Sequence, residues 1–370
     1  MKHKTTALLS GLVAVAIIIL FSCSKNNNDN PNPPAGAGDS ALVNIGTNII
    51  LISYQDLAAK TSAMDAAITT FVQSPDAGKL ASAQAAFKAA YLSWETCSEY
   101  EFGPAADQSL ATNTINVFPT DTAIIKNNIS SGNYTIDGIG NLKAQGFPAL
   151  DFLLFGTDNN SVLNRFTSDA AAANAKKYLS AIAASLKTKS ATVLAAWTGS
   201  YINTFKNATG VNAGSSLSLL VNAFVYDYDV VLKTYKLGIP FGKFGPTAVP
   251  QAPAKVEAYY SGISLQLMIQ QVKALQNIYL GGTGYGLDDK IIASKAQKNG
   301  VPLNDVIVAQ FNTLLVKLNA LSDPLAAAIV NNNTAVGEAY TEAGKLVVLL
   351  KVDLSSALGI KISFQDDDGD

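Results

Sequence analysis

The chain has 370 residues, of which 48 % are hydrophobic and 15 % charged, with a formal net charge of −2. Its single histidine, His3, lies in a predicted leader, so the mature protein is not expected to build a Ser-His-Asp triad, a Cys-His dyad or a histidine-based zinc site. Arg165 is the only arginine, and no basic surface is expected, which excludes a typical nucleic-acid groove.

The N-terminus has the pattern of a secretory signal. Basic residues at Lys2 and Lys4 are followed by an apolar run from Ala7 to Phe21, shorter than the roughly 20 residues of a membrane span. Leu20-Phe21-Ser22-Cys23 resembles a bacterial lipobox, which implies removal of residues 1–22 and lipidation of Cys23. An uncleaved anchor and an ordinary secretory signal are the alternatives.

Residues 23–40 are predicted to form a flexible linker, because they are rich in Asn, Pro and Gly and have no apolar face to bury. Ser24 follows the cysteine, where an aspartate would indicate retention at the inner membrane. The expected location is therefore the cell envelope, with the protein held by lipid at the outer membrane.

From Ala41 onward the apolar residues keep helical spacing, which predicts an all-α fold. Three helices are expected to end at glycines, at Gly238 with Pro240, at Gly281-Gly282 and at Gly359. The clearest stripes are Leu80, Ala83, Phe87, Tyr91 and Trp94; Leu217, Leu220, Val221, Phe224, Tyr228, Val231 and Tyr235; Leu265, Met268, Val272, Leu275 and Tyr279; and Leu346, Leu349, Leu350, Leu354 and Leu358.

Two helical-bundle domains are predicted, spanning residues 41–210 and 211–370, with the boundary in the Gly/Asn-rich stretch 207–216. A Phe-Gly-Pro triplet at residues 102–104 recurs at residues 244–246, which favours an internal duplication. A ligand site is expected at the interface of the two bundles. Tyr134-Thr135-Ile136 is either a small hairpin strand or no strand at all.

Several segments resemble the imelysin family of bacterial cell-envelope proteins, which includes iron-regulated proteins and a metallopeptidase. The segments are Trp94-Glu95-Thr96-Cys97-Ser98-Glu99-Tyr100-Glu101-Phe102-Gly103-Pro104, Asn116-Val117-Phe118-Pro119-Thr120-Asp121, the stretch from Gly146 to Gly156, Ser261-Gly262-Ile263-Ser264 and Gln276-Asn277-Ile278-Tyr279-Leu280-Gly281. The resemblance implies a two-bundle, all-α envelope protein with a site that binds a metal or a related ligand.

The family motif Gly-x-His-x-x-Glu aligns with Gly146-Phe147-Pro148-Ala149-Leu150-Asp151. Pro148 replaces the histidine and Asp151 replaces the glutamate, so the family's metal pair is half lost, because proline has no side-chain ligand atom. The implied peptidase activity therefore does not carry over, and the sequence leans against an enzyme.

Glu95 and Glu99 are four residues apart and are expected on one helical face. They are predicted ligand-binding residues, and with Asp151 the Glu99 carboxylate is a predicted metal ligand for iron or calcium. A solvated helix face is the alternative for the glutamates. For Asp151, which interrupts an apolar run, the alternative is an acid favoured by the helix dipole.

Pro148, Ser261 and Ser264 complete the predicted ligand site, with helix capping as the alternative for the two serines. Asp227 and Asp229 sit in an apolar helix and are expected to find partners on its surface. Lys243 could neutralise an acid in the pocket. Residues 366–370 are predicted to be a frayed acidic tail, with a tail docked on the fold as the alternative.

Three functions compete at this point. The first is a non-catalytic binding protein for iron or a related ligand, anchored to the membrane by lipid. The second is an interaction protein of the envelope whose ancestral site is lost, with an envelope protein as its partner. The third is a divergent metallopeptidase, which the missing imidazole disfavours.

Overall fold

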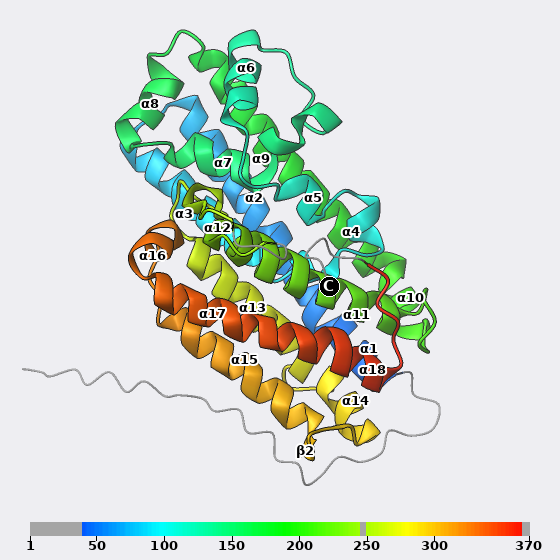
Figure 1. Cartoon of the computed structure of the whole chain (residues 1–370). Helices are drawn as coiled ribbons and strands as arrows, with labels where there is room; N and C mark the ends of the chain where they lie inside the picture. Colours follow the sequence, from blue (N-terminus) through cyan, green and yellow to red (C-terminus); the bar gives the residue numbers. More distant parts are fainter. Residues whose placement is uncertain (1–38, 245–248, 365–370) are drawn as a thin grey trace, which may run out of the picture. The chain divides into compact units, whose positions relative to one another are not determined.

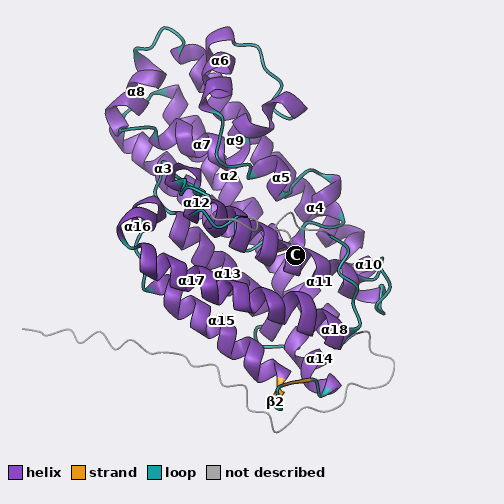
Figure 2. Cartoon of the chain, in the orientation of Figure 1, coloured by secondary structure: helices purple, strands orange, loops and turns teal. Residues whose placement is uncertain are grey.

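Helices form nearly all of the structure, as Figure 2 shows. The computed structural model describes residues 39–244 and 249–364, which belong to one compact unit beginning at Gly38. This confirms the predicted all-α fold. None of the described helices is both long enough and apolar enough to cross a membrane.

In the part of the chain that the structure describes, four long helices each contain a π-helical segment, and their backbone stays helical across every junction. Such segments often lie at functional sites because they change which side chains face a neighbour. The four are α1 (Ser40–Asn44), η1 (Ile45–Ile50) and α2 (Leu51–Gln73); α9 (Ala172–Ala196), η4 (Trp197–Tyr201) and α10 (Ile202–Asn207); α11 (Ser216–Tyr226), η5 (Asp227–Gly238) and α12 (Ile239–Phe241); and α17 (Asn333–Val348), η7 (Leu349–Leu354) and α18 (Ser355–Leu358).

The first half of the unit packs α2 against both α3 and α9, with α7 between α3 and α9 (Figure 1). Phe87, Tyr91 and Phe147 form its aromatic centre, where the rings of Tyr91 and Phe147 stack at 4.6 Å. The remaining elements are α3 (Ala77–Trp94), η2 (Ser98–Tyr100), α4 (Pro104–Asp107), α5 (Thr112–Ile115), α6 (Thr122–Ser131), η3 (Ile139–Ala144), α7 (Gly146–Phe155) and α8 (Asn159–Thr167).

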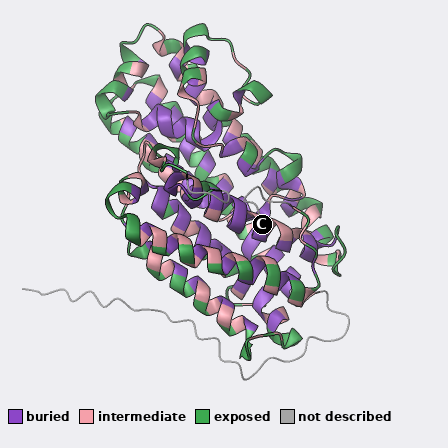
Figure 3. Cartoon of the chain, viewed as in Figure 1, coloured by how far each residue is buried: buried purple, intermediate pink, exposed green. Residues whose placement is uncertain are grey.

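The second half packs α15 between α13 and α17, and η5 lies against both α13 and α17 (Figure 1). Figure 3 shows buried residues concentrated on the faces where these helices meet. The elements not yet named are η6 (Pro253–Lys255), α13 (Ser264–Leu280), α14 (Leu287–Ser294), β1 (Gln297–Lys298), β2 (Val301–Pro302), α15 (Leu303–Asn319) and α16 (Leu325–Asn331).

Segments from the two halves meet at a junction that the candidate site occupies. Helix α11 and η5 contact η2, which directly follows α3, and α13 contacts α3. The N-terminal α1 contacts α14. The loop between Asn207 and Ser216 falls at the predicted boundary, but the division into two domains stays a prediction, because the described residues belong to one compact unit.

The predicted helix ends are confirmed at Gly281 and Gly359, which have φ values of 71° and 66°. The end predicted at Gly238 with Pro240 is wrong. The helix continues through both residues and stops at Gly242, with φ of 81°. Pro240 is tolerated because it lies in the first turn of α12, directly after the π-helical segment.

Residues 134–136 form no strand, and the small antiparallel hairpin of the structure is the pair β1 and β2. The predicted leader, residues 23–38 of the predicted linker with Cys23, and the acidic tail lie outside the described residues. The last two residues of the predicted linker belong to the first helix, because Asp39 caps α1 and α1 begins at Ser40. Gly245 and Pro246 do too, so the triplet that favours a duplication is not tested.

Candidate functional site

A buried ammonium group stands at the centre of the junction. Lys236, on η5, is 2 % exposed, and its Nζ lies 2.5 Å from Oε2 of Glu95 and 2.9 Å from Oε2 of Glu257. Both glutamates are almost completely buried. Glu95 caps the C-terminus of α3, and Glu257 lies in the turn before α13, so three separate segments supply the three charges.

A hydrogen-bond chain fixes Glu257 from the other side. Its Oε1 accepts hydrogen bonds from Asn116 Nδ2 at 2.7 Å and from the Tyr91 hydroxyl at 3.2 Å. The Tyr91 hydroxyl also lies 2.5 Å from Asn116 Oδ1. Ser264 Oγ donates to the backbone carbonyl of Glu257. Every polar atom around Glu257 therefore favours a single position of its carboxylate.

Beside this ion pair lies a second group of buried acids. Asp227 accepts a hydrogen bond from Gln271 Nε2 at 2.7 Å, and the Ser98 hydroxyl donates to Glu99 at 3.5 Å. One oxygen each of Glu95, Glu99, Asp227 and Gln271 is buried without a hydrogen-bond partner. The junction thus holds more buried acceptors than donors, which is costly unless protons or a cation compensate.

Burial dominates the electrostatics of the group. Desolvation and the neighbouring Glu257 raise the pKa of Glu95 well above its usual value, against the opposing effect of Lys236. Desolvation and the charge of Asp227 raise the pKa of Glu99 in the same way. Burial alone would lower the pKa of Lys236, but the charges of Glu257 and Glu95 outweigh it and raise that pKa. The ammonium therefore stays charged at physiological pH.

Asp151 lies on α7, with Pro148 in the first turn of the same helix, as predicted. Its two oxygens accept hydrogen bonds from the backbone N–H groups of Tyr260 and Ser261, both at 2.9 Å. Burial raises its pKa to about 6, although these bonds act in the opposite direction. Pro148 and Asp151 line a small pocket of about 80 Å³. Asp151 thereby anchors the turn that carries Glu257.

Glu95 and Glu99 do not share a helical face, because α3 ends at Trp94 and Glu99 lies in the following η2. The alternative of a solvated face also fails, because both side chains are 0 % exposed. The structure brings Glu95 to the ion pair and Glu99 to Asp227, so the two predicted residues lie in adjoining parts of one buried cluster.

The two serines have different places. Ser261 binds Asp151 through its backbone, while the Ser264 hydroxyl bonds to Glu257 rather than capping α13. Asp323 instead accepts hydrogen bonds from the first N–H groups of α13, at Leu265 and Gln266. Neither serine hydroxyl is therefore the cap of this helix.

Sequence reasoning chose the wrong lysine and underestimated the two aspartates of η5. Lys243 is exposed, and Lys236 neutralises the acids instead. Asp227 and Asp229 are each 1 % exposed, and Asp229 forms an ion pair with Lys351 at 3.0 Å. Lys236 could have been suspected from its place in the apolar stripe between Leu232 and Leu237, whereas Glu257 and Asn116 carry no such signal.

A cavity at the junction has a volume of about 620 Å³. Segments from both halves line it, with aromatic side chains and a few polar groups. Asn116 belongs both to this wall and to the hydrogen-bond chain of Glu257. The lining residues are Glu101, Phe102, Thr112, Asn113, Asn116, Val117, Phe118, Leu142, Lys143, Leu219, Asn222, Ala223, Tyr226, Tyr235, Ser363 and Phe364.

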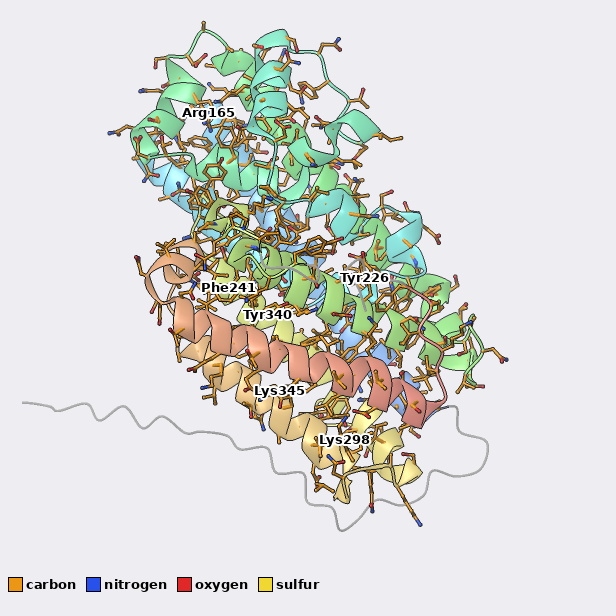
Figure 4. All side chains as sticks on the ribbon, viewed as in Figure 1. Arg165, Tyr226, Phe241, Lys298, Tyr340 and Lys345 are labelled. Carbon is orange, nitrogen blue, oxygen red and sulfur yellow. The ribbon has the colours of Figure 1, made fainter. Side chains whose placement is uncertain are left out.

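Residues 361–364, the last that the structure describes and here called the C-terminal tail, form one wall of the cavity through Ser363 and Phe364. Asn222 holds it by donating to the Lys361 carbonyl at 3.1 Å and accepting from the Ser363 N–H at 2.7 Å. The Phe364 ring meets the edge of Tyr226, the residue labelled near the end of α11 in Figure 4, with a centroid distance of 5.3 Å. The ammonium of Lys351 lies 5.6 Å from the Phe364 ring centroid.

Two groups on the cavity wall have unusual hydrogen bonding. The Thr112 hydroxyl is buried without a partner, in a side chain that is 8 % exposed. Glu101 accepts a hydrogen bond from the Thr112 N–H, and burial raises its pKa to about 7. The Glu101 carboxyl is therefore about half protonated near neutral pH and can either donate or accept a hydrogen bond.

Within the described ranges 39–244 and 249–364, no three His, Cys, Asp or Glu side chains gather in an arrangement that could hold a metal ion. The predicted metal ligands do not fit such a role well as they stand. Asp151 uses both oxygens for backbone donors, and Glu99 faces Asp227. A metal at Asp151 and Glu99 stays a prediction.

Comparisons with known proteins agree with this architecture. A crystal structure from Parabacteroides distasonis ATCC 8503, provisionally described as an iron-regulated protein A precursor, superposes with a TM-score of 0.69 at 19 % identity, covering 88 % of this chain and 97 % of that one. An imelysin-like protein from Psychrobacter arcticum 273-4 gives 0.65 at 17 % identity, covering 89 % and 100 %. No curated protein matches the sequence. The family model described as imelysin, peptidase M75, matches residues 50–351, and the chain therefore belongs to the imelysin family.

Proposed function

We propose that this protein is a non-catalytic binding protein of the cell envelope that holds a small ligand in the 620 Å³ cavity at the junction. The observation that carries the proposal is the cavity itself, with the buried, unpartnered hydroxyl of Thr112 in its wall. A buried hydroxyl without a partner costs free energy that a ligand can recover by bonding to it.

The cavity has the size and chemistry of a small-molecule site. Its volume falls within the range of about 300–1,000 Å³ that is usual for such sites. Phe102, Phe118, Tyr226 and Phe364 supply apolar and aromatic surface. Glu101 and Thr112 supply polar groups that can orient a ligand, which supports an organic molecule or a metal complex with both apolar and hydrogen-bonding parts.

The non-catalytic part of the proposal rests on the residues at the motif position. Pro148 offers no ligand or base, and Asp151 is engaged by the backbone of Tyr260 and Ser261. Lys236 is held charged between two carboxylates, so it is not available as a nucleophile or a base.

The suggestion that the ligand contains iron comes from the similar proteins. The protein from Parabacteroides distasonis is described as iron-regulated, which makes iron and iron-carrying compounds the first ligands to try. The predicted leader and lipobox support an envelope location with a lipid anchor at Cys23, where a protein for ligand uptake would be useful.

The test is to measure which ligand the purified protein carries and binds. Native mass spectrometry of protein extracted from its own envelope should reveal a bound compound, and titration with ferric iron, haem and calcium should identify the class. Thr112→Val should weaken binding of that compound. Thr341→Val, which removes an exposed hydroxyl on α17, should not.

A folded protein that carries no compound and binds none of these ligands would overturn the proposal. In that case, specific capture of an envelope partner would favour an interaction protein. Chelator-sensitive cleavage of a peptide library would favour a peptidase.

A further inference from the structure

The position of Lys236 in the carboxylate centre carries an inference that does not depend on the cavity or its ligand. We infer that the ammonium of Lys236 is the resident cation of this centre, standing where a divalent metal ion would otherwise be bound by Glu95 and Glu257. The protein's own side chain thus fills a cation site.

The carboxylate oxygens around Lys236 Nζ are arranged as ligands are around a bound metal cation. Two carboxylate oxygens from different segments approach Nζ to 2.5 Å and 2.9 Å. Carboxylate oxygens bind calcium at about 2.3–2.6 Å, so the shorter contact falls within this range and the longer one exceeds it by only a few tenths of an ångström. An ammonium is a compact point charge on a flexible stem, which lets it occupy such a position.

The carboxylates are held in place independently of the lysine. Asn116 and Tyr91 fix the far oxygen of Glu257, and Ser264 binds its backbone carbonyl. Glu95 is placed by the end of α3. Removal of the lysine side chain should therefore leave two carboxylates facing a space of its size rather than a collapsed pair.

The charges of the centre are better matched by a divalent ion than by one ammonium. Glu95 and Glu257 together carry two negative charges when ionised, and Asp227 lies close enough to affect the pKa of Glu95. The buried Oε1 of Glu95 has no hydrogen-bond partner and is available to a cation.

The same charge explains why the native centre should exclude metal. A divalent ion bound to Glu95 and Glu257 would lie within a few ångströms of the ammonium. The repulsion between them in a buried site would exceed what the two already paired carboxylates could offset. Metal binding should therefore appear only when the ammonium is removed.

The experiment uses Mn²⁺ as the probe, because carboxylate and carbonyl oxygens suit this ion and its free form is measured directly by electron paramagnetic resonance. Lys236→Ala should bind one Mn²⁺ per chain, with a Kd of about 10⁻⁴ M or tighter. The native protein should not bind at this centre. Lys351→Ala, which removes a lysine paired with Asp229, is the matched control and should behave like the native protein.

Adding Glu257→Gln to the Lys236→Ala variant should weaken Mn²⁺ binding at least about tenfold, because one charged ligand is lost. The aspartates of residues 366–370 are present in all variants, so any Mn²⁺ that they bind cancels from the comparison. A folded Lys236→Ala protein that binds no more Mn²⁺ than the native chain would overturn the inference. So would a native protein that binds one Mn²⁺ lost on Glu257→Gln.

If Lys236→Ala does not fold in the absence of metal, adding Mn²⁺ still tests the inference. Circular dichroism should then show the helical fold restored by millimolar Mn²⁺, because the metal replaces the missing cation. A variant that stays unfolded in Mn²⁺ contradicts the inference, because the carboxylates then cannot accept a metal in place of the ammonium.

Discussion

The Nζ of Lys236 lies 2.5 Å from Oε2 of Glu95, across 141 positions of sequence, and both side chains are buried. This contact joins the end of α3 to the π-helical segment η5, and Glu257 completes it from the turn before α13. The charged centre therefore ties together three segments that the sequence keeps far apart, and both stability and function should respond to it.

Removing one partner of this ion pair should strongly destabilise the protein. Lys236→Met leaves two buried carboxylates without their cation, at an expected loss of about 3–5 kcal/mol in the free energy of unfolding, measured by urea denaturation. Lys187→Met breaks an ion pair with Asp65 that lies at the surface and should cost less than about 1 kcal/mol. Equal losses in the two variants would contradict a special role for the buried centre.

Asp151 should act through the turn that it anchors. Asp151→Asn replaces one of two acceptor oxygens by an amide that faces a backbone N–H, at an expected cost of about 1–3 kcal/mol. Hydrogen exchange should rise at Tyr260 and Ser261 and in the turn with Glu257. Asp121→Asn, at the N-cap of α6, should leave stability nearly unchanged, because asparagine caps helices as well as aspartate does.

Stability should fall as the pH rises from about 4 to 7. Burial raises the pKa of Asp151 and of Asp227 to about 6 and that of Glu101 to about 7. In this range the folded state keeps protons that the unfolded state has released, so the stabilisation present at low pH is lost as each folded-state pKa is passed. Urea denaturation at a series of pH values measures the slope.

Glu101→Gln should reduce that slope, because glutamine does not titrate and removes the contribution of one group. Glu338→Gln, which changes an exposed acid on α17, is the control and should leave the slope as it is. A stability that rises between pH 4 and 7 in the native protein would show that other groups dominate the titration.

The C-terminal tail should open when its anchor is removed. Asn222→Ala deletes the hydrogen bonds to Lys361 and Ser363, which should raise hydrogen exchange in residues 361–364 and speed the release of any ligand in the cavity. Asn312→Ala, which removes a surface contact with Gln276, should change neither measurement. An unchanged tail in Asn222→Ala would mean that Phe364 and Tyr226 suffice to hold it.

The sequence by itself determined the helices and much of their burial. The stripe of Leu80, Phe87 and Trp94 is buried along α3, and the ends at Gly281 and Gly359 fall where the pattern placed them. These features are local, because helical spacing and the left-handed conformation of glycine depend on residues close in the chain. The family resemblance located Asp151 and Glu99 for the same reason, as short motifs.

Only the tertiary structure decided which charges meet. Lys236, Glu95 and Glu257 come from three segments, and nothing in the spacing of a single segment reveals that their side chains converge. Because α3 ends at Trp94, Glu95 and Glu99 lie in different parts of the buried cluster. Lys236 lies in η5, which continues as a helix into α12 through Pro240. Burial in the assembled core, rather than residue type, turned these acids and one lysine into a single charged centre.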